Sequence, residues 1–225
     1  MEILFKNKDA AVVYKEPGIP SQPDPSGDID AMTRAAQELR SLGEPDTLYL
    51  VHRLDRVVGG VMLFARNKAA AARFSALVSG EGIGKEYLAV IDGSLDSGEL
   101  CDYLYKDRRA GKSFVVDRAR GGVKLAELKF LKISSIETDR GIKSLVKVKL
   151  KTGRFHQIRA QFSSRGVPIC GDGKYGSRDN RANMPALFAY KLSLDSDGIS
   201  VRQLPDTDAY PWCLFDKDIW RNLDD

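Results

Sequence analysis

A dense cluster of charged side chains at residues 52–56, His-Arg-Leu-Asp-Arg, stands between two apolar runs of this chain. The runs, residues 48–51 and 61–65, have the length and the β-branched or aromatic content of buried strands. A turn between two strands needs only a few polar residues and a glycine. Asp55 is the one carboxylate among cations and potential cations. This concentration beside core strands indicates a catalytic or binding site, although a solvated loop with surface ion pairs is the commoner fate of a charged cluster.

A second candidate is Arg159, which a predicted helix places on a buried face. The hydrophobic spacing predicts a helix that starts at Phe155 and buries Phe155, Ile158 and Phe162. Arg159 lies four residues after Phe155 and three before Phe162, so it shares their side. A buried guanidinium is unfavourable unless a carboxylate meets it. Asp55, a carboxylate between two predicted core strands, is likewise unfavourable unless a cation meets it. We therefore expect the two to pair, either as catalytic groups or as a purely architectural ion pair.

The histidines and cysteines do not indicate a metal site. His52 and His156 are the only histidines, and two histidines without a carboxylate cluster or a thiolate pair make a weak case for a metal. We interpret them as hydrogen-bonding scaffold or ligand contacts. Cys101, Cys170 and Cys213 are far apart and have no C-x-x-C spacing, so we expect free thiols that serve packing in a reducing compartment.

Four stretches of the chain resemble, in order, the motifs of the RluA family of RNA pseudouridine synthases. The stretches and their motifs are residues 52–56 with Gly60 (HRLD), residues 85–89 (K-x-Y-x-A), residues 152–159 (TGRxHQIR) and residues 168–176 (PIxGDxxYG). The resemblance extends over most of the chain, from about residue 12 to residue 192. One such motif alone would be weak, but four in the same order are specific.

The resemblance implies an enzyme that isomerises uridine in RNA to pseudouridine: the N1–C1′ bond breaks, the uracil turns, and C5 bonds to C1′. It implies Asp55 as the nucleophile, Arg159 as the group that keeps it ionised and oriented, and Tyr87 as the side chain that stacks on the uracil and helps to remove the C5 proton. By residue type alone, Tyr87 would be an ordinary strand tyrosine. The carboxylate could attack C1′ as in retaining glycosidases, act as a base at C2′ or add to C6. The isomerisation needs no group donor and no redox change, so no cofactor is expected.

Ribosomal or transfer RNA is the implied substrate, and basic residues are expected to contact it. Residues 105–124 hold seven Lys or Arg against two Asp, and on a nucleic-acid enzyme such a segment can contact phosphates. Arg56 could fill the space that a flipped base leaves, and the helix that Gly153 and Arg154 are expected to open could hold a phosphate. The expected RNA-contact residues are His52, Arg53, Arg56, Lys85, Arg108, Arg109, Lys112, Arg154 and His156.

The order of elements indicates an α+β domain with a mostly antiparallel sheet, because strands outnumber helices and do not alternate with them. Helices are expected over residues 28–42, 67–80 and 155–165, the first capped by Asp28 and the second by Asn67. Strands are expected over residues 85–91, 125–130 and 144–151. The resemblance implies the pseudouridine synthase fold, a bent mixed sheet with flanking helices and an active-site cleft across its middle.

We expect one catalytic domain over residues 1–225, with strands and a loop in residues 1–27 and an acidic tail in residues 195–225. The net charge is +4. The tail carries −5 and the rest of the chain +9, which suits a polyanionic partner. Trp212 and Trp220 are expected to dock the tail on the core. No apolar run is long enough to cross a bilayer and no signal peptide is expected, so we expect a cytoplasmic protein. Separately, we expect a monomer without the S4-type RNA-binding domain that the family optionally carries.

Several positions depart from the family's pattern, although none is Asp55, Tyr87 or Arg159. The departures are Val58-Gly59 in place of Thr-Ser, Phe155 in place of Thr or Ser, and Gln161 and Phe188 in place of His. They concern the choice of RNA more than catalysis.

Two other functions are considered. A catalytically silent RNA-binding or RNA-folding protein of the same fold would not need a buried carboxylate. A glycoside hydrolase would need two working carboxylates near one bond, and no second acid stands out.

Overall fold

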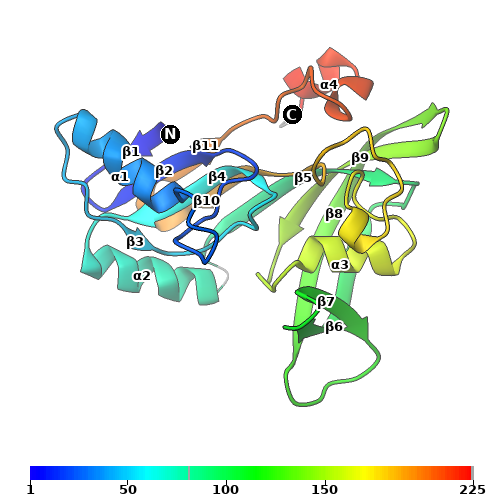
Figure 1. Ribbon diagram of the computed structural model, residues 1–225, viewed down its shortest axis with the longest axis horizontal. Coiled ribbons are helices and arrows are strands. Elements are labelled where there is room, and N and C mark those ends of the chain that lie inside the picture. Colours follow the sequence, from blue (N-terminus) through cyan, green and yellow to red (C-terminus); the bar gives the residue numbers. More distant parts are fainter. Residues whose placement is uncertain (81, 224–225) are drawn as a thin grey trace. The chain divides into compact units, whose positions relative to one another are not determined.

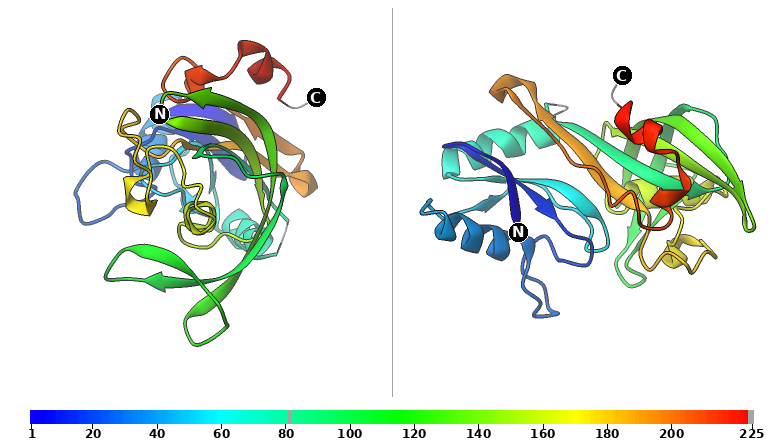
Figure 2. Two further views of the ribbon diagram at one scale, coloured as in Figure 1. Left: turned by 90° about the vertical axis from the view of Figure 1, so that its right-hand side faces the viewer. Right: turned by 90° about the horizontal axis from the view of Figure 1, so that it is seen from above.

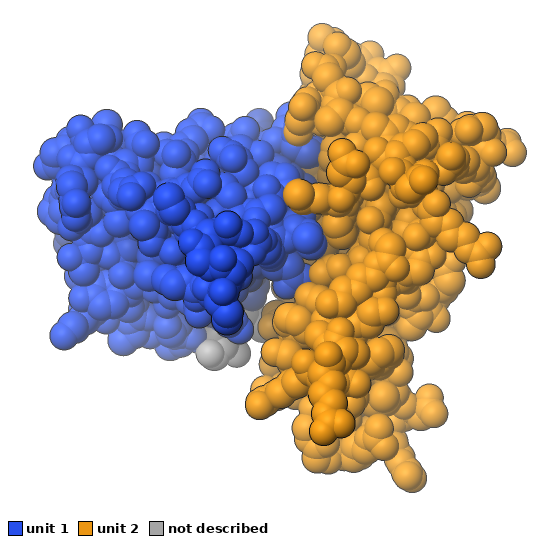
Figure 3. All heavy atoms as spheres, viewed as in Figure 1, with its two compact units in different colours: residues 1–85, 188–205 blue, residues 86–187, 206–225 orange. Residues whose placement is uncertain are grey.

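A computed structural model describes residues 1–80 and 82–223 of the chain (Figure 1). The chain divides into two compact units, each built from two separate stretches. The first unit holds residues 1–85 and 188–205, and the second holds residues 86–187 and 206–225 (Figure 3). In the described residues, no helix is long and apolar enough to span a membrane.

The first unit is built on strands around β4, whose seven residues are all buried. Its strands are β1 (Glu2–Lys6), β2 (Ala10–Lys15), β3 (Tyr49–Leu50), β4 (Gly59–Ala65), β10 (Leu187–Leu194) and β11 (Ile199–Arg202). The order is β1-β2-β4-β10, with β3 paired to β4 and β11 to β10. The β4–β10 pair is parallel and the other pairs are antiparallel. The two apolar runs that flank the charged cluster form strands as predicted, and they pair with each other. The second is buried throughout, but the first is a half-buried strand of two residues, so its predicted burial is wrong.

Gly60 is required where β4 meets β10. Its φ is +123°, and a Cβ atom there would lie 2.2 Å from the carbonyl oxygen of Ala189. Only glycine combines this backbone conformation with so close an approach. Gly60 thus allows the close approach of β4 and β10.

Two helices cover this unit. Helix α1 (Ala31–Ser41) buries Ala31, Ala35 and Leu39, and helix α2 (Lys68–Ser79) packs on β3 and β4. Asn67 caps α2 as predicted, accepting from the Ala70 amide at 2.8 Å.

The predicted cap of α1 is wrong. Asp30, and not Asp28, accepts from the Thr33 amide at 3.1 Å, because the extended backbone of Asp30 aims its carboxylate at that amide. The side chain of Asp28 instead bonds Arg56. Leu42, the last residue of the predicted helix, lies beyond the end of α1 and is 54% exposed.

The second unit is an antiparallel set of long, strongly curved strands (Figure 2). Its strands are β5 (Gly84–Asp92), β6 (Gly98–Asp107), β7 (Lys112–Val116), β8 (Val123–Thr138) and β9 (Gly141–Leu150), in the order β5-β9-β8-β6-β7. Strand β8 runs eight residues beyond the predicted end at Phe130, because its polar second half pairs with β9 as a hairpin. The mostly antiparallel pairing that the order of elements predicts is confirmed, and the parallel β4–β10 pair makes the sheet mixed, as the resemblance implies.

Helix α3 (Gln157–Ser164) packs on β6 and β7. It starts two residues later than predicted, because His156 has a left-handed backbone, with φ 51°. Phe155 therefore precedes the helix and is half-buried, so its placement on the buried helical face is wrong. Gly153 and Arg154 also lie outside the helix.

Short elements complete the chain. The 3-10 turn η1 (Gly173–Tyr175) lies between α3 and β10, η2 (Asp195–Asp197) lies between β10 and β11, and η3 (Trp212–Leu214) and helix α4 (Lys217–Arg221) follow β11. Trp212 and Trp220 are 8% and 7% exposed, with their rings edge to face at 6.2 Å. The two rings are buried against each other, and the Lys147 ammonium of β9 donates to the Leu223 carbonyl at 2.8 Å, which ties the tail to the sheet. Docking of the rings themselves on the core stays a prediction.

Candidate active site

The loop that carries Asp55 runs between β3 and β4, and its backbone is held on both sides of the aspartate. The Ser21 hydroxyl donates to the Leu54 carbonyl at 2.7 Å and accepts from the Leu54 amide at 3.1 Å. The Gly18 amide donates to the Arg56 carbonyl at 2.8 Å. The residues before and after Asp55 are thus anchored to the segment that follows β2. The half-buried Asp55 side chain is presented by a loop with little freedom.

Lys15, the last residue of β2, is a buried ammonium beside this loop. It is fully buried, and its Nζ donates to the carbonyls of Ile19 at 2.7 Å, Glu16 at 3.1 Å and Arg56 at 3.1 Å. Three acceptors match the three protons of an ammonium. Burial lowers the pKa of Lys15 to about 8, against the opposing attraction of the Asp55 carboxylate. Lys15 therefore holds the loop and places positive charge near Asp55.

His52 is a scaffold residue within this loop. Its Nε2 accepts from the Leu63 amide of β4 at 3.1 Å, so the proton of a neutral ring sits on Nδ1. Burial, and then the nearby Lys85, lower the pKa of His52 to about 4. The scaffold interpretation is confirmed, whereas contacts of His52 and of the buried Lys85 with RNA stay predictions.

Arg53 and Arg56 are the exposed cations of the loop. The Arg56 guanidinium bonds the Asp28 carboxylate and the Ser26 hydroxyl, the latter at 3.0 Å. These bonds lower the pKa of Asp28. Arg56 is thus held by residues 24–28. To contact RNA, its guanidinium must first release Asp28 and Ser26.

Arg159, 4% exposed, forms a two-pronged ion pair with Asp172, which is 1% exposed. Its Nε donates to Asp172 Oδ2 at 2.6 Å and its Nη2 to Oδ1 at 2.8 Å. The guanidinium carbon also lies 4.9 Å from the centre of the Tyr175 ring. The predicted burial of Arg159 is confirmed, but Asp172 provides the carboxylate that makes this burial tolerable. The inference that burial alone requires Asp55 as partner is therefore wrong.

Tyr87 lies on β5, 8% exposed, opposite Val148 of β9. Tyr87 and Arg159 belong to the second unit and Asp55 to the first. The grouping of the three side chains, and the Asp55–Arg159 pair, stay predictions.

His156 anchors the turn before α3. Its ring stacks on Phe155, with centres 3.8 Å apart and planes at 21°, and its Nδ1 lies 2.9 Å from the Tyr175 hydroxyl, which also accepts from the Ser113 amide. Burial, followed by the charges of Arg159, Lys174 and Lys106, lowers the pKa of His156 to about 3. The ring is neutral, and a phosphate contact would have to be a hydrogen bond rather than an ion pair.

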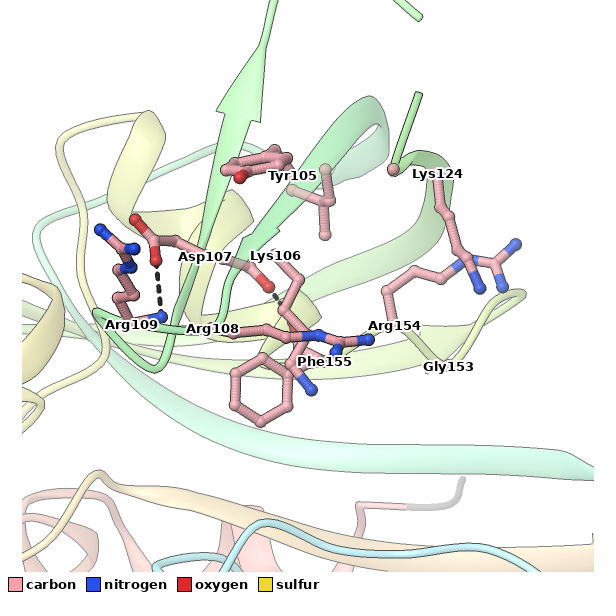
Figure 4. A pocket seen from close by; sticks show the side chains of 12 residues that line it. Tyr105, Lys106, Asp107, Arg108, Arg109, Lys124, Gly153, Arg154 and Phe155 are labelled. Carbon is pink, nitrogen blue, oxygen red and sulfur yellow. Dashed lines mark hydrogen bonds between the residues drawn. The ribbon is translucent and has the colours of Figure 1, made fainter. Parts of the chain in front are cut away.

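A basic pocket opens between β6, β7 and the turn before α3 (Figure 4). Its volume is about 870 Å³. The charged side chains that line it are Lys106, Asp107, Arg108, Arg109, Lys124 and Arg154. Three of the expected RNA-contact residues, Arg108, Arg109 and Arg154, thus share one pocket. Lys112 is not among its lining residues and lies with its ammonium 5.7 Å from the Tyr175 ring centre.

Asp92, Cys170 and Asp179 lie close enough together to hold a metal. The buried ammonium of Lys143, however, bonds both carboxylates, with Asp179 at 2.9 Å, and the Tyr210 hydroxyl donates to Asp179 at 2.5 Å. A lysine already fills the cation position, so this cluster is a structural network.

The residue pattern assigns no role to Asp172 or Lys15, and it places Phe155 on a buried helical face rather than at a pocket. Asp172 lies in the PIxGDxxYG stretch, and the signal that could have found it is the presence of a second acid that competes with Asp55 for Arg159. Lys15 directly follows the apolar run of residues 10–14, and this position at the end of a buried strand is the signal that could have found it. Of the cysteines, only Cys170 is buried, so the packing role predicted for Cys101 and Cys213 is wrong.

Comparison with known proteins identifies the class of protein. A family model described as RNA pseudouridylate synthase matches residues 9–164. An uncharacterized RNA pseudouridine synthase of Haemophilus influenzae is 30% identical over 214 residues, 91% of this chain and 88% of that protein. The tRNA pseudouridine synthase C of the same organism is 34% identical over 164 residues, 68% of this chain and 67% of that protein. The solved structure of human RNA pseudouridylate synthase domain containing 1 has a TM-score of 0.76 at 22% identity, covering 99% of this chain and 93% of that one.

The chain therefore belongs to the RNA pseudouridylate synthase family, in its RluA branch, and it has the pseudouridine synthase fold. The matched range contains Asp55, Tyr87 and Arg159. The chain spans 63% of the length of the Bacillus subtilis pseudouridine synthase YhcT, with 29% identity over 195 residues.

Proposed function

We propose that this protein isomerises uridine to pseudouridine at specific positions of ribosomal or transfer RNA, with Asp55 as the nucleophile. The observation that carries the proposal is the anchored loop of Asp55, in which Ser21 and Lys15 hold the carbonyls of Leu54 and Arg56. A nucleophile must be held near its productive geometry, and a loop tethered on both sides of one carboxylate meets that need. The catalytically silent alternative would not need it.

In the proposed reaction the Asp55 carboxylate attacks C1′ of the target uridine and the N1–C1′ electron pair leaves with the uracil. The uracil turns, its C5 bonds to C1′, and the bond to Asp55 breaks, which restores the carboxylate. The C5 proton then leaves and N1 gains a proton, so the product is an isomer of the substrate. Tyr87 stacks on the turning uracil and assists removal of the C5 proton.

Arg159 orients and keeps ionised the Asp55 carboxylate in this proposal. The pair with Asp172 accounts for two of the five N–H donors that a guanidinium carries. Asp172 would then act as a positioning residue, because it holds the plane of the guanidinium.

The proposed RNA class follows the names of relatives. The tRNA pseudouridine synthase C of H. influenzae is one, and its ribosomal large subunit pseudouridine synthase C, 30% identical over 200 residues, is another. We propose that the protein acts as a monomer in the cytoplasm and without a metal. Light scattering of the purified protein, and mapping of pseudouridines in cellular RNA with and without the gene, test these points.

The direct test is Asp55→Asn, assayed by release of tritium from RNA labelled at C5 of uridine. The variant should form no pseudouridine, while its affinity for RNA stays within about tenfold, or 1.4 kcal/mol, of the unmodified protein. Asp46→Asn is the matched control, because Asp46 pairs with Arg40 on the surface and should not matter. Near-normal turnover by Asp55→Asn would refute the assignment.

Substrate deuterated at C2′ separates two routes for the same carboxylate. Abstraction of the C2′ proton breaks the labelled bond and should slow turnover several-fold. Attack at C1′, as proposed, leaves that bond intact, and the two substrates should react at nearly equal rates.

A further inference from the structure

Phe155 is an aromatic side chain at the edge of the pocket lined by Lys106, Arg108, Arg109, Lys124 and Arg154. It is half-buried and lines that pocket. Figure 4 shows Lys124 and Arg154 on one side of the pocket and Arg109 on the other, with Phe155 between them. An aromatic ring at the side of a cationic pocket is the combination with which proteins bind unpaired bases and their phosphates.

The pocket has an excess of positive charge that its own residues do not neutralise. Asp107 is its one carboxylate, and its Oδ1 accepts from the backbone amides of Arg109 and Ala110 at 2.8 and 3.0 Å. Asp107 therefore shapes the β6–β7 turn. The Nε of Arg154 donates to the Leu125 carbonyl at 2.8 Å, which fixes this guanidinium at the pocket wall. The charge complements a polyanion such as an RNA backbone.

The Phe155 ring is supported on one face and covered by a replaceable group on the other. His156 stacks on it at 3.8 Å and is itself tied to Tyr175 at 2.9 Å. Within the described part of the chain, His156 is the single non-glycine residue with a positive φ, a conformation that persists where the surroundings impose it. The ammonium of the exposed Lys106 lies 4.1 Å from the Phe155 ring centre. A cation held on a ring at such a site contributes only about 0.5–1 kcal/mol, so a base can displace it.

We propose that this pocket binds an unpaired nucleotide of the RNA substrate, with its base stacked on Phe155. Lys106 moves from the ring to the phosphate of that nucleotide, and Lys124 and Arg154 hold the neighbouring phosphates. The inference rests on the proposed RNA substrate and deepens it, since it names the conformation of RNA that the protein selects: a splayed, single-stranded nucleotide. Thr or Ser, which the family commonly has at this position, could not form the stack.

The test measures binding of a labelled, unstructured RNA of about ten nucleotides, a length within the site sizes of single-strand binding folds. Phe155→Leu removes the π-face and should weaken binding about tenfold, near the lower end of the stacking contribution per base, without changing the salt dependence. Phe155→Trp keeps an aromatic face and should bind the RNA about as tightly as the unmodified protein does. Arg154→Gln and Lys124→Gln should each lower the slope of log K against log salt by about 0.7.

The matched control is Phe114→Leu. Phe114 lies on β7 of the same hairpin and is 45% exposed, but it does not line the pocket. Equal losses for Phe114→Leu and Phe155→Leu would mean non-specific contact and would overturn the proposal, as would unchanged binding by a folded Phe155→Leu. If Phe155→Leu melts early, photo-crosslinking of the unmodified protein to RNA containing 5-iodouridine decides: the crosslink should map to Phe155, and crosslinks only outside the pocket would overturn the proposal.

The outcomes separate this subsite from the proposed activity. Binding that depends on Phe155 without any pseudouridine formation would leave the subsite standing and refute the activity. Pseudouridine formation with no effect of Phe155→Leu on affinity or kcat/KM would refute the subsite and leave the activity standing.

Discussion

The Arg159 guanidinium meets the Asp172 carboxylate through two parallel hydrogen bonds of 2.6 and 2.8 Å, with both side chains at least 95% buried. Such an arrangement fixes the plane of the guanidinium as well as its position. If Arg159 acts in catalysis, its guanidinium does so in the orientation that Asp172 fixes. Removal of either partner would leave the other as a buried, uncompensated charge.

Arg159→Met should destabilise the protein by about 3–5 kcal/mol, because it leaves Asp172 as a buried carboxylate without its cation. The double variant Arg159→Met/Asp172→Leu should recover most of that loss, since an apolar pair of similar volume replaces the ion pair. Urea denaturation followed by circular dichroism measures both.

Turnover separates the structural role of Arg159 from the catalytic one. If Arg159 acts on Asp55, the stable double variant should stay severely impaired in pseudouridine formation, with its RNA affinity and salt slope little changed. Recovery of turnover together with stability would mean that Arg159 is architectural only. A lower salt slope with normal turnover at saturating RNA would instead place Arg159 at the RNA surface.

Lys15→Met should slow pseudouridine formation at least tenfold without comparable loss of RNA affinity, because the carbonyl of Arg56 loses its ammonium donor beside Asp55. Single-turnover kinetics at saturating RNA measure the effect. Turnover within about twofold of the unmodified protein would show that the remaining bond from the Gly18 amide suffices.

The pH dependence of stability gives a second measure of Lys15. Its pKa is about 8 in the fold against 10.5 ordinarily, so between these values the unfolded chain binds more protons and stability rises with pH. Below pH 8 both states are charged and the burial penalty is fully present. Relative to Lys15→Met, the unmodified protein should gain about 3 kcal/mol on going from pH 8 to pH 10.5. The free energy of unfolding is measured by urea titration at each pH. If it changed equally with pH in both proteins, the result would contradict this prediction.

Gly60→Ala should destabilise the protein by more than about 3 kcal/mol or prevent folding, because the new methyl group would lie 2.2 Å from the Ala189 carbonyl oxygen. Gly27→Ala is the control: its φ is also positive, at +77°, but nothing lies within 4 Å. It should cost only the backbone strain, about 1–2 kcal/mol. Thermal melting of both variants tests whether the close approach, rather than φ alone, requires glycine.

Two of the three cysteines should react with iodoacetamide in the native protein at pH 8. Cys101 and Cys213 are exposed, whereas Cys170 is buried. Burial, and then the nearby Asp92, raise the pKa of Cys170 to about 12, and only the thiolate is nucleophilic. Mass spectrometry should find the third label only after unfolding in urea. Rapid labelling of Cys170 in the native state would contradict the packing described for it.

Pseudouridine formation should proceed in the presence of EDTA and without added nucleotide. The proposed reaction rearranges bonds within the substrate and needs no donor, acceptor or Lewis acid. A metal requirement that persists after the RNA has been folded separately would count against the mechanism.

The class of protein and the individual candidate residues could be predicted from the sequence because they depend on local order. The strands beside the charged cluster, the cap at Asn67 and the burial of Arg159 follow from periodicity over a few residues. The motifs that contain Asp55, Tyr87 and Arg159 are likewise short stretches. The errors at Asp28 and Phe155 are also local, because two nearby acids competed for one cap and a left-handed residue delayed a helix.

Only the tertiary structure decided which groups meet. Asp172 rather than Asp55 accounts for the burial of Arg159, Lys15 reaches the carbonyl of Arg56 forty-one residues away, and Lys143 occupies the space between Asp92 and Asp179. Spacing within one element determines which face a side chain takes. The partner it finds there depends on how separate elements pack, and a one-dimensional pattern of residue types does not encode those distances.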